Sequence, residues 1–255
     1  MAIQKNSPWQ RVSYDYSGLK VLVTGATSGI GASIANAYFM AGAEVIVTGT
    51  AADAAAYNDQ ALSRYRYLPL QLSSRDSIDA AIESIDSLDI LVNNAGGTGG
   101  TEQPFDFDTA VYVNLNATHH LSEGLVPLLA DSQLTGGASI VNLASEMSLF
   151  AAPYFPGYGA AKAAIVQLTK TMACVYAQQG IRANAVLPGS VRTKMTEVFA
   201  ADDDIHQAVC NRTPLKRWGD PLEIAAATLF LSSPSASFVS GHTLVVDGAY
   251  STIDA

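Results

Sequence analysis

A tyrosine and a lysine stand four positions apart, at Tyr158 and Lys162. If the segment is helical, their side chains lie on one face, because residues i and i+4 are neighbours on a helix. A free phenol has a pKa near 10 and is a poor base at neutral pH. A positive charge about 4 Å away, at an effective dielectric of about 20, lowers that pKa by up to about three units. The pair is therefore suited to general acid–base chemistry near pH 7.

A serine precedes this pair by thirteen positions. Ser145 follows the apolar run Ser139–Leu143, and its hydroxyl can hold a substrate oxygen and stabilise charge that develops on it. Ser148 is the alternative, but it lies further beyond the end of the run. We therefore favour Ser145.

A glycine-rich turn follows the first apolar run of the chain. Residues Thr24 to Gly31 have the pattern G-x-x-x-G-x-G and lead directly into the helix-like run Ala32–Met40. Glycine allows positive φ and close approach of the backbone to a pyrophosphate, and the amides at a helix start attract its charge. The position of this turn between a strand and a helix favours a dinucleotide site.

Short apolar runs alternate with helix-like segments along the chain. The periodicity predicts helices such as Gly31–Met40, Gly159–Gln178 and Pro221–Leu231. This alternation predicts an α/β fold, a doubly wound parallel sheet of about seven strands with helices on both faces and ligands at the carboxyl ends of the strands. The expected strands are Leu19–Val23, Glu44–Thr48, Tyr67–Leu70, Asp89–Val92, Ser139–Leu143, Arg182–Leu187 and Thr243–Val246.

The glycine turn, Asn93-Asn94-Ala95-Gly96 and Tyr158-x-x-x-Lys162, in this order and spacing, resemble the short-chain dehydrogenase/reductase family. The resemblance covers nearly the whole chain after Ser17. It implies a Rossmann-type fold and an NAD(P)-dependent oxidoreductase that interconverts a secondary alcohol and a ketone. Tyr158 would act as acid and base, and an oxidised nicotinamide would also lower its pKa. The implied catalytic residues are Asn114, Ser145, Tyr158 and Lys162, with Asn114 anchoring a water near Lys162.

The same resemblance implies a cofactor site and a substrate site. Val191 backbone groups and the Thr193 hydroxyl would hold the nicotinamide carboxamide. The implied cofactor residues are Gly25, Thr27, Ser28, Gly29, Ile30, Gly31, Thr50, Gln71, Leu72, Asn94, Ala95, Gly96, Tyr158, Lys162, Pro188, Gly189, Val191 and Thr193. The implied substrate residues are Ser145, Glu146, Met147, Tyr154, Tyr158, Met195 and Phe199.

The sequence departs from the family pattern where the adenosine would bind. An acidic residue at the end of the second strand would select NAD, and an arginine there would favour NADP. The chain has Gly49 and Thr50 instead, and Ser28 stands where many NADP-dependent relatives carry a basic residue. Gln71 replaces a frequent aspartate after the third strand. The sequence therefore leaves the choice between NAD and NADP open.

Two segments that border the substrate differ as well. The stretch between Gly96 and Asn114 is shorter than in acyl-carrier-protein reductases, and the expected substrate lid, residues 193–217, carries the acidic run Asp202–Asp204. Both features argue against acyl-carrier substrates, although the acidic run also fits a solvated helix start. Glu146 would either bind a polyol hydroxyl or form an ion pair outside the site, and the sequence does not separate these alternatives.

Composition bounds the remaining possibilities. The 255 residues are 49% hydrophobic with a net charge of −9, which suits one globular domain and argues against nucleic acid or an anionic membrane as partner. Cys174 and Cys210 lack metal-ligand spacing, so no metal site is expected. We expect residues 1–17 to form an N-terminal arm, more a loose tail than an arm that packs on a neighbouring subunit, and residues 18–255 to form the catalytic domain. No export signal or membrane helix is apparent, which predicts a cytoplasmic protein.

The leading hypothesis is an oxidoreductase for a polyol, sugar, cyclic or other small alcohol. The alternative is a 3-oxoacyl thioester reductase. A catalytically silent dinucleotide sensor is disfavoured, because the chain keeps both Tyr158 and Lys162. The resemblance also implies a homotetramer that assembles through two long helices and the C-terminal strand.

Overall fold

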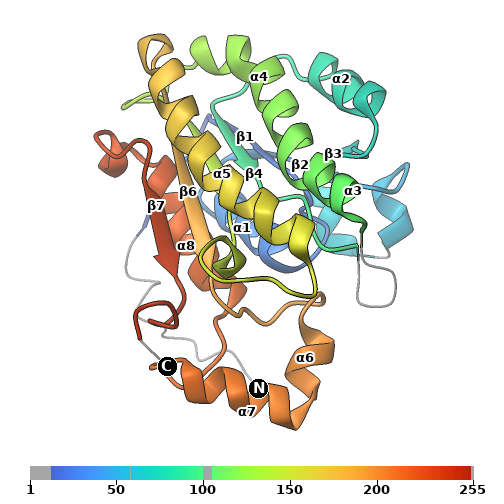
Figure 1. Cartoon of the computed structure of the whole chain (residues 1–255). Coiled ribbons are helices and arrows are strands. Elements are labelled where there is room, and N and C mark those ends of the chain that lie inside the picture. Colours follow the sequence, from blue (N-terminus) through green and yellow to red (C-terminus); the bar gives the residue numbers. More distant parts are fainter. Residues whose placement is uncertain (1–12, 58, 100–104, 254–255) are drawn as a thin grey trace.

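A seven-stranded parallel sheet forms the centre of the computed structural model, which describes residues 13–57, 59–99 and 105–253. The strand order is β3-β2-β1-β4-β5-β6-β7, and every neighbouring pair is parallel (Figure 1). The predicted doubly wound fold is therefore confirmed. The strands are β1 (Lys20–Val23), β2 (Glu44–Gly49), β3 (Arg66–Pro69), β4 (Ile90–Asn93), β5 (Ala138–Leu143), β6 (Ile181–Pro188) and β7 (Thr243–Val246).

Helices cover both faces of the sheet. α1 and α8 pack together on one face, while α2, α4 and α5 lie on the other (Figure 1). The helices are α1 (Gly29–Met40), α2 (Arg75–Glu83), α3 (Phe107–Val111), α4 (Ala117–Ala130), α5 (Pro156–Val175), α6 (Glu197–Ala201), α7 (Asp203–Arg212) and α8 (Pro221–Ser232). In the described ranges, none of them has the length and apolar character needed to cross a membrane.

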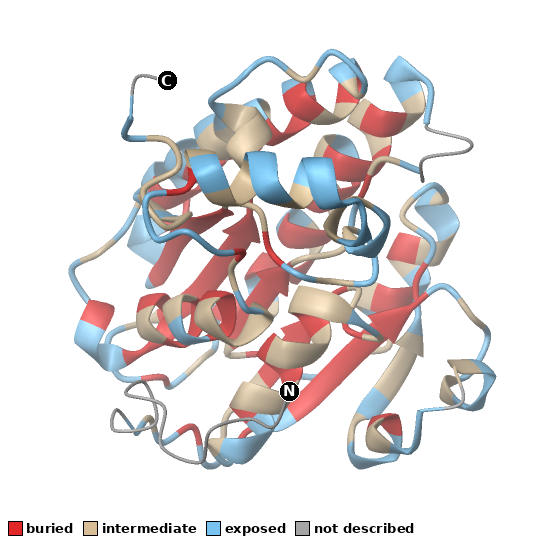
Figure 2. Ribbon diagram, turned by 90° about the horizontal axis from the view of Figure 1, so that it is seen from below, coloured by how far each residue is buried: buried red, intermediate tan, exposed pale blue. Residues whose placement is uncertain are grey.

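The strands separate two apolar cores because successive side chains point to opposite faces. In β1, Val21 and Val23 join the core under α1 and α8, whereas Leu22 joins the core under α2, α4 and α5. All three residues are at most 1% exposed. Figure 2, which looks from below at the molecule of Figure 1, shows the buried strands enclosed by partly exposed helices.

Buried amides connect the two central strands. Asn93 of β4 and Asn142 of β5 are register partners, and the Asn93 side-chain amide donates to the Asn142 side-chain oxygen at 2.8 Å. Asn142 in turn donates to the Thr169 hydroxyl of α5 at 2.9 Å. The hydrogen bonds satisfy polar groups that would otherwise be costly to bury.

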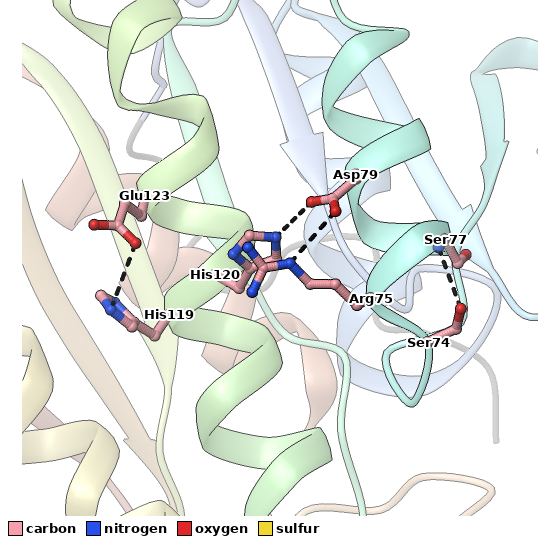
Figure 3. A network of polar contacts seen from close by, with 7 residues as sticks. All are labelled: Ser74, Arg75, Ser77, Asp79, His119, His120 and Glu123. Atoms are coloured by element: carbon pink, nitrogen blue, oxygen red, sulfur yellow. Dashed lines mark hydrogen bonds and ion pairs between the residues drawn. The ribbon is translucent and has the colours of Figure 1, made fainter.

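A smaller polar network joins α2 to α4 at the surface (Figure 3). Asp79 lies 2.5 Å from the ring of His120 on α4 and accepts a hydrogen bond from Arg75 at 3.4 Å. The hydrogen bond with His120 is the main cause that lowers the pKa of the Asp79 carboxyl. Because the Asp79 side chain is 46% exposed, this network contributes little to stability and mainly orients α2.

Tyr16, near the end of the predicted N-terminal arm of residues 1–17, packs into the domain. Tyr16 is 1% exposed, and its hydroxyl donates to the Leu229 carbonyl at 2.5 Å and lies 2.8 Å from the Ser232 hydroxyl. Its ring packs edge-on against Tyr38. At least this part of the arm thus belongs to the core of the domain, while residues 1–12 lie outside the described ranges.

Candidate active site

Tyr158 and Lys162 lie one turn apart near the start of α5, beside the carboxyl end of β5. Lys162 is only 5% exposed, and its Nζ donates to the Leu143 carbonyl at 2.7 Å. The same Nζ lies 5.6 Å from the centre of the Tyr158 ring. The lysine therefore points into the protein and not into solvent.

Burial dominates the acid–base properties of both groups. It lowers the pKa of the Lys162 ammonium to about 8. It also raises the pKa of the Tyr158 phenol above its ordinary value, although a hydrogen bond with Ser145 acts in the opposite direction. In the chain by itself, the net effect is therefore a higher Tyr158 pKa, and the lowering by Lys162 that the sequence led us to expect is not among its causes.

Ser145 lies directly beyond β5 and begins the 3₁₀ turn Glu146–Ser148. Its backbone is extended, and its hydroxyl accepts a hydrogen bond from the Met147 amide at 3.2 Å. The Ser148 hydroxyl is buried and has no partner among the described residues. Of the two serines, only Ser145 is among the causes that shift the pKa of Tyr158, and its catalytic role stays a prediction.

Asn114 sits in a π-helical turn, Tyr112–Asn116, that joins α3 to α4. Its side chain accepts from the Gly97 amide and donates to the Gly97 carbonyl, both at 2.9 Å. It also donates to the Ala110 carbonyl at 2.8 Å. A side chain at Gly96 would collide with the Asn114 oxygen and approach the Lys162 amine to 3.8 Å. Asn114 thus orders the loop that follows β4 beside the lysine, whereas the nearby Asn116 is exposed.

The glycine turn after β1 is held by hydrogen bonds to the residues that follow β4. Gly25 and Gly29 adopt positive φ of 63° and 58°, and a side chain at Gly31 would collide with Asn94 and with the Gly25 carbonyl. The Asn94 side-chain amide donates to the carbonyls of Thr24 and Gly25 at 2.9 and 3.1 Å. The Thr24 hydroxyl accepts hydrogen bonds from the backbone amides of Asn94 and Ala95, a stabilising role that the sequence did not reveal.

This turn fits the pyrophosphate of a dinucleotide. Ser28 precedes α1 and makes no side-chain hydrogen bond to the first turn of the helix. The amides of that turn are therefore free of a side-chain cap and can donate to an anion. Thr27 and Ile30, the other predicted residues of the turn, are partly exposed beside it.

The adenosine side contains an aromatic residue that sequence reasoning missed. The Tyr57 hydroxyl accepts from the Ala51 amide at 2.9 Å and lies over Gly49, where any side chain would collide with it. The Gln71 amide donates to the Thr50 carbonyl at 2.8 Å, while Leu72 packs against the core. A contact between a 3₁₀ turn and a strand end has no local pattern that could have predicted it.

The loop expected to hold the nicotinamide follows β6. Pro188, the last residue of β6, is buried, and Val191 of the loop forms a parallel bridge with Gly219. The Thr196 hydroxyl, which was not predicted, donates to the Val191 carbonyl at 2.6 Å and lies 3.2 Å from the Thr193 hydroxyl. Both groups expected to bind the carboxamide are therefore already oriented by the first turn of the lid.

The predicted substrate residues are not all brought together. Met147 follows Ser145, and a side chain at Gly97 would approach the Met195 methyl to 3.3 Å, which places this lid residue over the loop after β4. Phe199 is partly buried in α6. Tyr154 is 85% exposed, so its assignment stays a prediction. α6 and α7 lie beyond the carboxyl ends of β6 and β7, in the position of a lid (Figure 1).

A separate cleft of about 240 Å³ lies behind the nicotinamide loop. Ser190, Asp247 and Ala249 line it together with Arg217 and Glu223, and none of the four catalytic candidates does. We therefore do not regard it as the substrate site. Within the described residues, no group of three or more His, Cys, Asp or Glu side chains is placed to hold a metal ion.

Comparison with known proteins agrees with this geometry. Residues 25–251 match the profile of a family described as enoyl-(acyl carrier protein) reductase. The gluconate 5-dehydrogenase of Gluconobacter oxydans is 34% identical over 250 residues, which cover 92% of this chain and 95% of that protein. The 3-oxoacyl-[acyl-carrier-protein] reductase of Vibrio harveyi is 34% identical, over 91% of this chain and 96% of that protein.

A solved structure is similar as well. The gluconate 5-dehydrogenase of Burkholderia cenocepacia, in complex with NADP and tartrate, superimposes with a TM-score of 0.83 at 29% identity, over 94% of this chain and 98% of that one. The chain belongs to the short-chain dehydrogenase/reductase family. It is an NAD(P)-dependent oxidoreductase that interconverts a secondary alcohol and a ketone.

Proposed function

We propose that the substrate is a small polyhydroxylated alcohol or its ketone, such as a sugar acid, and that Tyr158 transfers the proton. The observation that carries the proton role is the placement of Tyr158, Ser145 and the buried Lys162 at the carboxyl end of β5. The relatives described as gluconate 5-dehydrogenases support the substrate class.

Each of the proposed catalytic residues has a defined part. The Ser145 hydroxyl holds the substrate oxygen beside Tyr158, which gives or takes the proton on that oxygen. Lys162, anchored on Leu143, stabilises the phenolate, and Asn114 keeps the loop after β4 in place. The bound nicotinamide supplies hydride exchange and, when oxidised, a positive charge that favours the phenolate. The turn after β1 and the loop after β6 would hold that cofactor.

The test is a panel of substrates with wild type and Tyr158→Phe. D-gluconate, other polyols, cyclic alcohols and β-keto thioesters are assayed by nicotinamide absorbance with NAD and NADP. We expect a polyol or sugar acid to be turned over, and Tyr158→Phe to lower kcat at least about a hundredfold. Tyr65→Phe, remote from β5, is the matched control and should keep its activity.

Other outcomes would contradict the proposal. Turnover of β-keto thioesters alone would favour the second candidate, a 3-oxoacyl thioester reductase, which the Vibrio relative supports. Tight dinucleotide binding with no turnover of any compound would favour a silent sensor. A drop of less than about tenfold in Tyr158→Phe would remove Tyr158 from its assigned role.

We also propose a cytoplasmic homotetramer. The support is the family membership, together with the long helices α4 and α5, which lie side by side on one face (Figure 1). Light scattering after size exclusion should give about four times the 26.7 kDa of one chain. A monomer at micromolar concentration would contradict this assembly.

A further inference from the structure

Glu146 is a buried carboxyl group beside the proposed catalytic residues, and the mechanism above does not use it. It follows Ser145 directly and begins the 3₁₀ turn Glu146–Ser148. This turn packs against the start of α5, since a side chain at Gly159, the residue after Tyr158, would approach the Met147 carbonyl to 3.4 Å. Backbone packing thus fixes Glu146 close to the helix turn that carries the phenol.

The two oxygens of the Glu146 carboxyl differ in their hydrogen bonding. Oε1 accepts a hydrogen bond from the Ser190 hydroxyl at 3.1 Å, whereas Oε2 is buried and has no hydrogen-bond partner among the residues that the structure describes. A residue that only tethers the loop after β6 needs one acceptor oxygen. A glutamine would provide that acceptor without the cost of a buried charge. The carboxyl therefore calls for an explanation based on its charge.

Two charged groups, Asp247 and Arg212, act on the Glu146 carboxyl. Burial raises the pKa of its carboxyl, the Ser190 hydrogen bond lowers that pKa, Asp247 after β7 raises it, and Arg212 at the end of α7 lowers it. The Arg212 guanidinium also lies over the rings of Phe150 and Tyr250, at 4.9 and 4.4 Å from their centres. Glu146 in turn raises the pKa of Tyr158, so each of the two ionisations opposes the other.

We propose that Glu146 is a positioning residue for proton transfer: its carboxylate, held by Ser190 beside the catalytic turn, opposes negative charge on Tyr158 and sets how alkaline the solution must be for Tyr158 to act as a base. The inference rests on the proposed function, because it acts through Tyr158. In this inference, the carboxylate controls the pH range in which the alcohol is oxidised and does not contact the substrate.

The decisive variant is Glu146→Gln, which keeps an acceptor for Ser190 and removes the charge. We expect the alkaline rise of log kcat/KM for oxidation to shift to lower pH by at least about half a unit, which is about a threefold higher kcat/KM on the rising limb. The assay uses the substrate found in the panel above. Glu44→Gln, at the far end of β2, removes an exposed carboxylate remote from the site and should leave the profile unchanged.

Ser190→Ala separates charge from tethering. It removes the hydrogen bond to Oε1 but leaves the carboxylate in place, so its pH profile should stay within about 0.2 unit of wild type. If the two variants shift the profile equally, or if Glu146→Gln leaves it unmoved while Tyr158→Phe abolishes turnover, the inference is overturned and the proposed function stands. If Tyr158→Phe stays active, the proposed function fails, and the inference falls with it.

A titration without substrate or cofactor gives a second readout. Absorbance at 295 nm reports phenolate, and subtracting the curve of the matching Tyr158→Phe protein isolates Tyr158 in each background. In Glu146→Gln, the Tyr158 phenolate should form at a lower pH than in wild type. Identical difference curves would contradict the inference.

Discussion

The Lys162 amine donates to the Leu143 carbonyl at 2.7 Å, so the helix that carries the tyrosine is fastened to the end of the central strand. This contact spans α5 and β5 and fixes the ammonium beside Tyr158. Burial of this cation is costly, because in the described residues only one backbone oxygen accepts a hydrogen bond from it. That cost makes the stability of the protein depend on pH.

Lys162→Met should remove part of that pH dependence. Burial lowers the pKa of Lys162 from 10.5 to about 8 in the folded chain, so between these values the unfolded chain binds more protons and stability rises with pH. The free energy of unfolding of wild type, relative to that of Lys162→Met, should be about 2 kcal/mol higher at pH 9.5 than at pH 7. Urea unfolding at both pH values measures this, with the exposed Lys170→Met as control.

Gly31→Ala should weaken dinucleotide binding more than it weakens the fold. The added methyl group would meet the Asn94 amide and the Gly25 carbonyl, which forces the turn after β1 to open. We expect the Kd for the cofactor, followed by nicotinamide fluorescence, to rise more than about tenfold, or about 1.4 kcal/mol. An unchanged Kd would argue against this turn as the pyrophosphate site.

Thr50→Asp should move cofactor preference toward NAD. A carboxylate at the end of β2 accepts hydrogen bonds from ribose hydroxyls and repels a 2′-phosphate. The ratio of kcat/KM for NAD over NADP should rise at least about tenfold over that of wild type, while the uncharged Thr50→Asn changes it little. If both variants give the same ratio, charge at this position does not control selectivity.

Tyr16→Phe should destabilise the fold without affecting catalysis. The change removes the donor to the Leu229 carbonyl and leaves the Ser232 hydroxyl with fewer partners in a buried site. We expect a loss of about 1–2 kcal/mol in the free energy of unfolding. Tyr14→Phe, which removes a less buried hydroxyl, is the control, and equal losses in the two variants would contradict this explanation.

Local patterns predicted most of the fold and the central part of the candidate site. The β7 prediction matches its observed bounds, and the other strands agree within one or two residues, because apolar runs between polar turns are a local property. Tyr158 and Lys162 were predicted together because helical spacing alone places them side by side.

Contacts outside the regular helix and strand patterns were not predictable in the same way. The Tyr57 hydroxyl over Gly49 and the Thr196 hydroxyl on Val191 depend on the conformation of irregular turns, and the burial of Tyr16 depends on how segments distant in sequence meet. The effect of burial on the pKa of Tyr158 also belongs to this group, since desolvation depends on the completed fold.

The amide pair in the middle of the sheet has a consequence for folding. Asn93 and Asn142 lie opposite each other in neighbouring parallel strands that are otherwise almost wholly aliphatic, so hydrophobicity alone would tolerate several alignments. A slip of one residue in either strand would turn the amide of that strand toward the opposite core and break the hydrogen bond between the two amides, a penalty of about 1–3 kcal/mol. The two asparagines therefore discriminate against misaligned strands, and the correct alignment brings the end of β5, with Ser145, level with the glycine-rich end of β4.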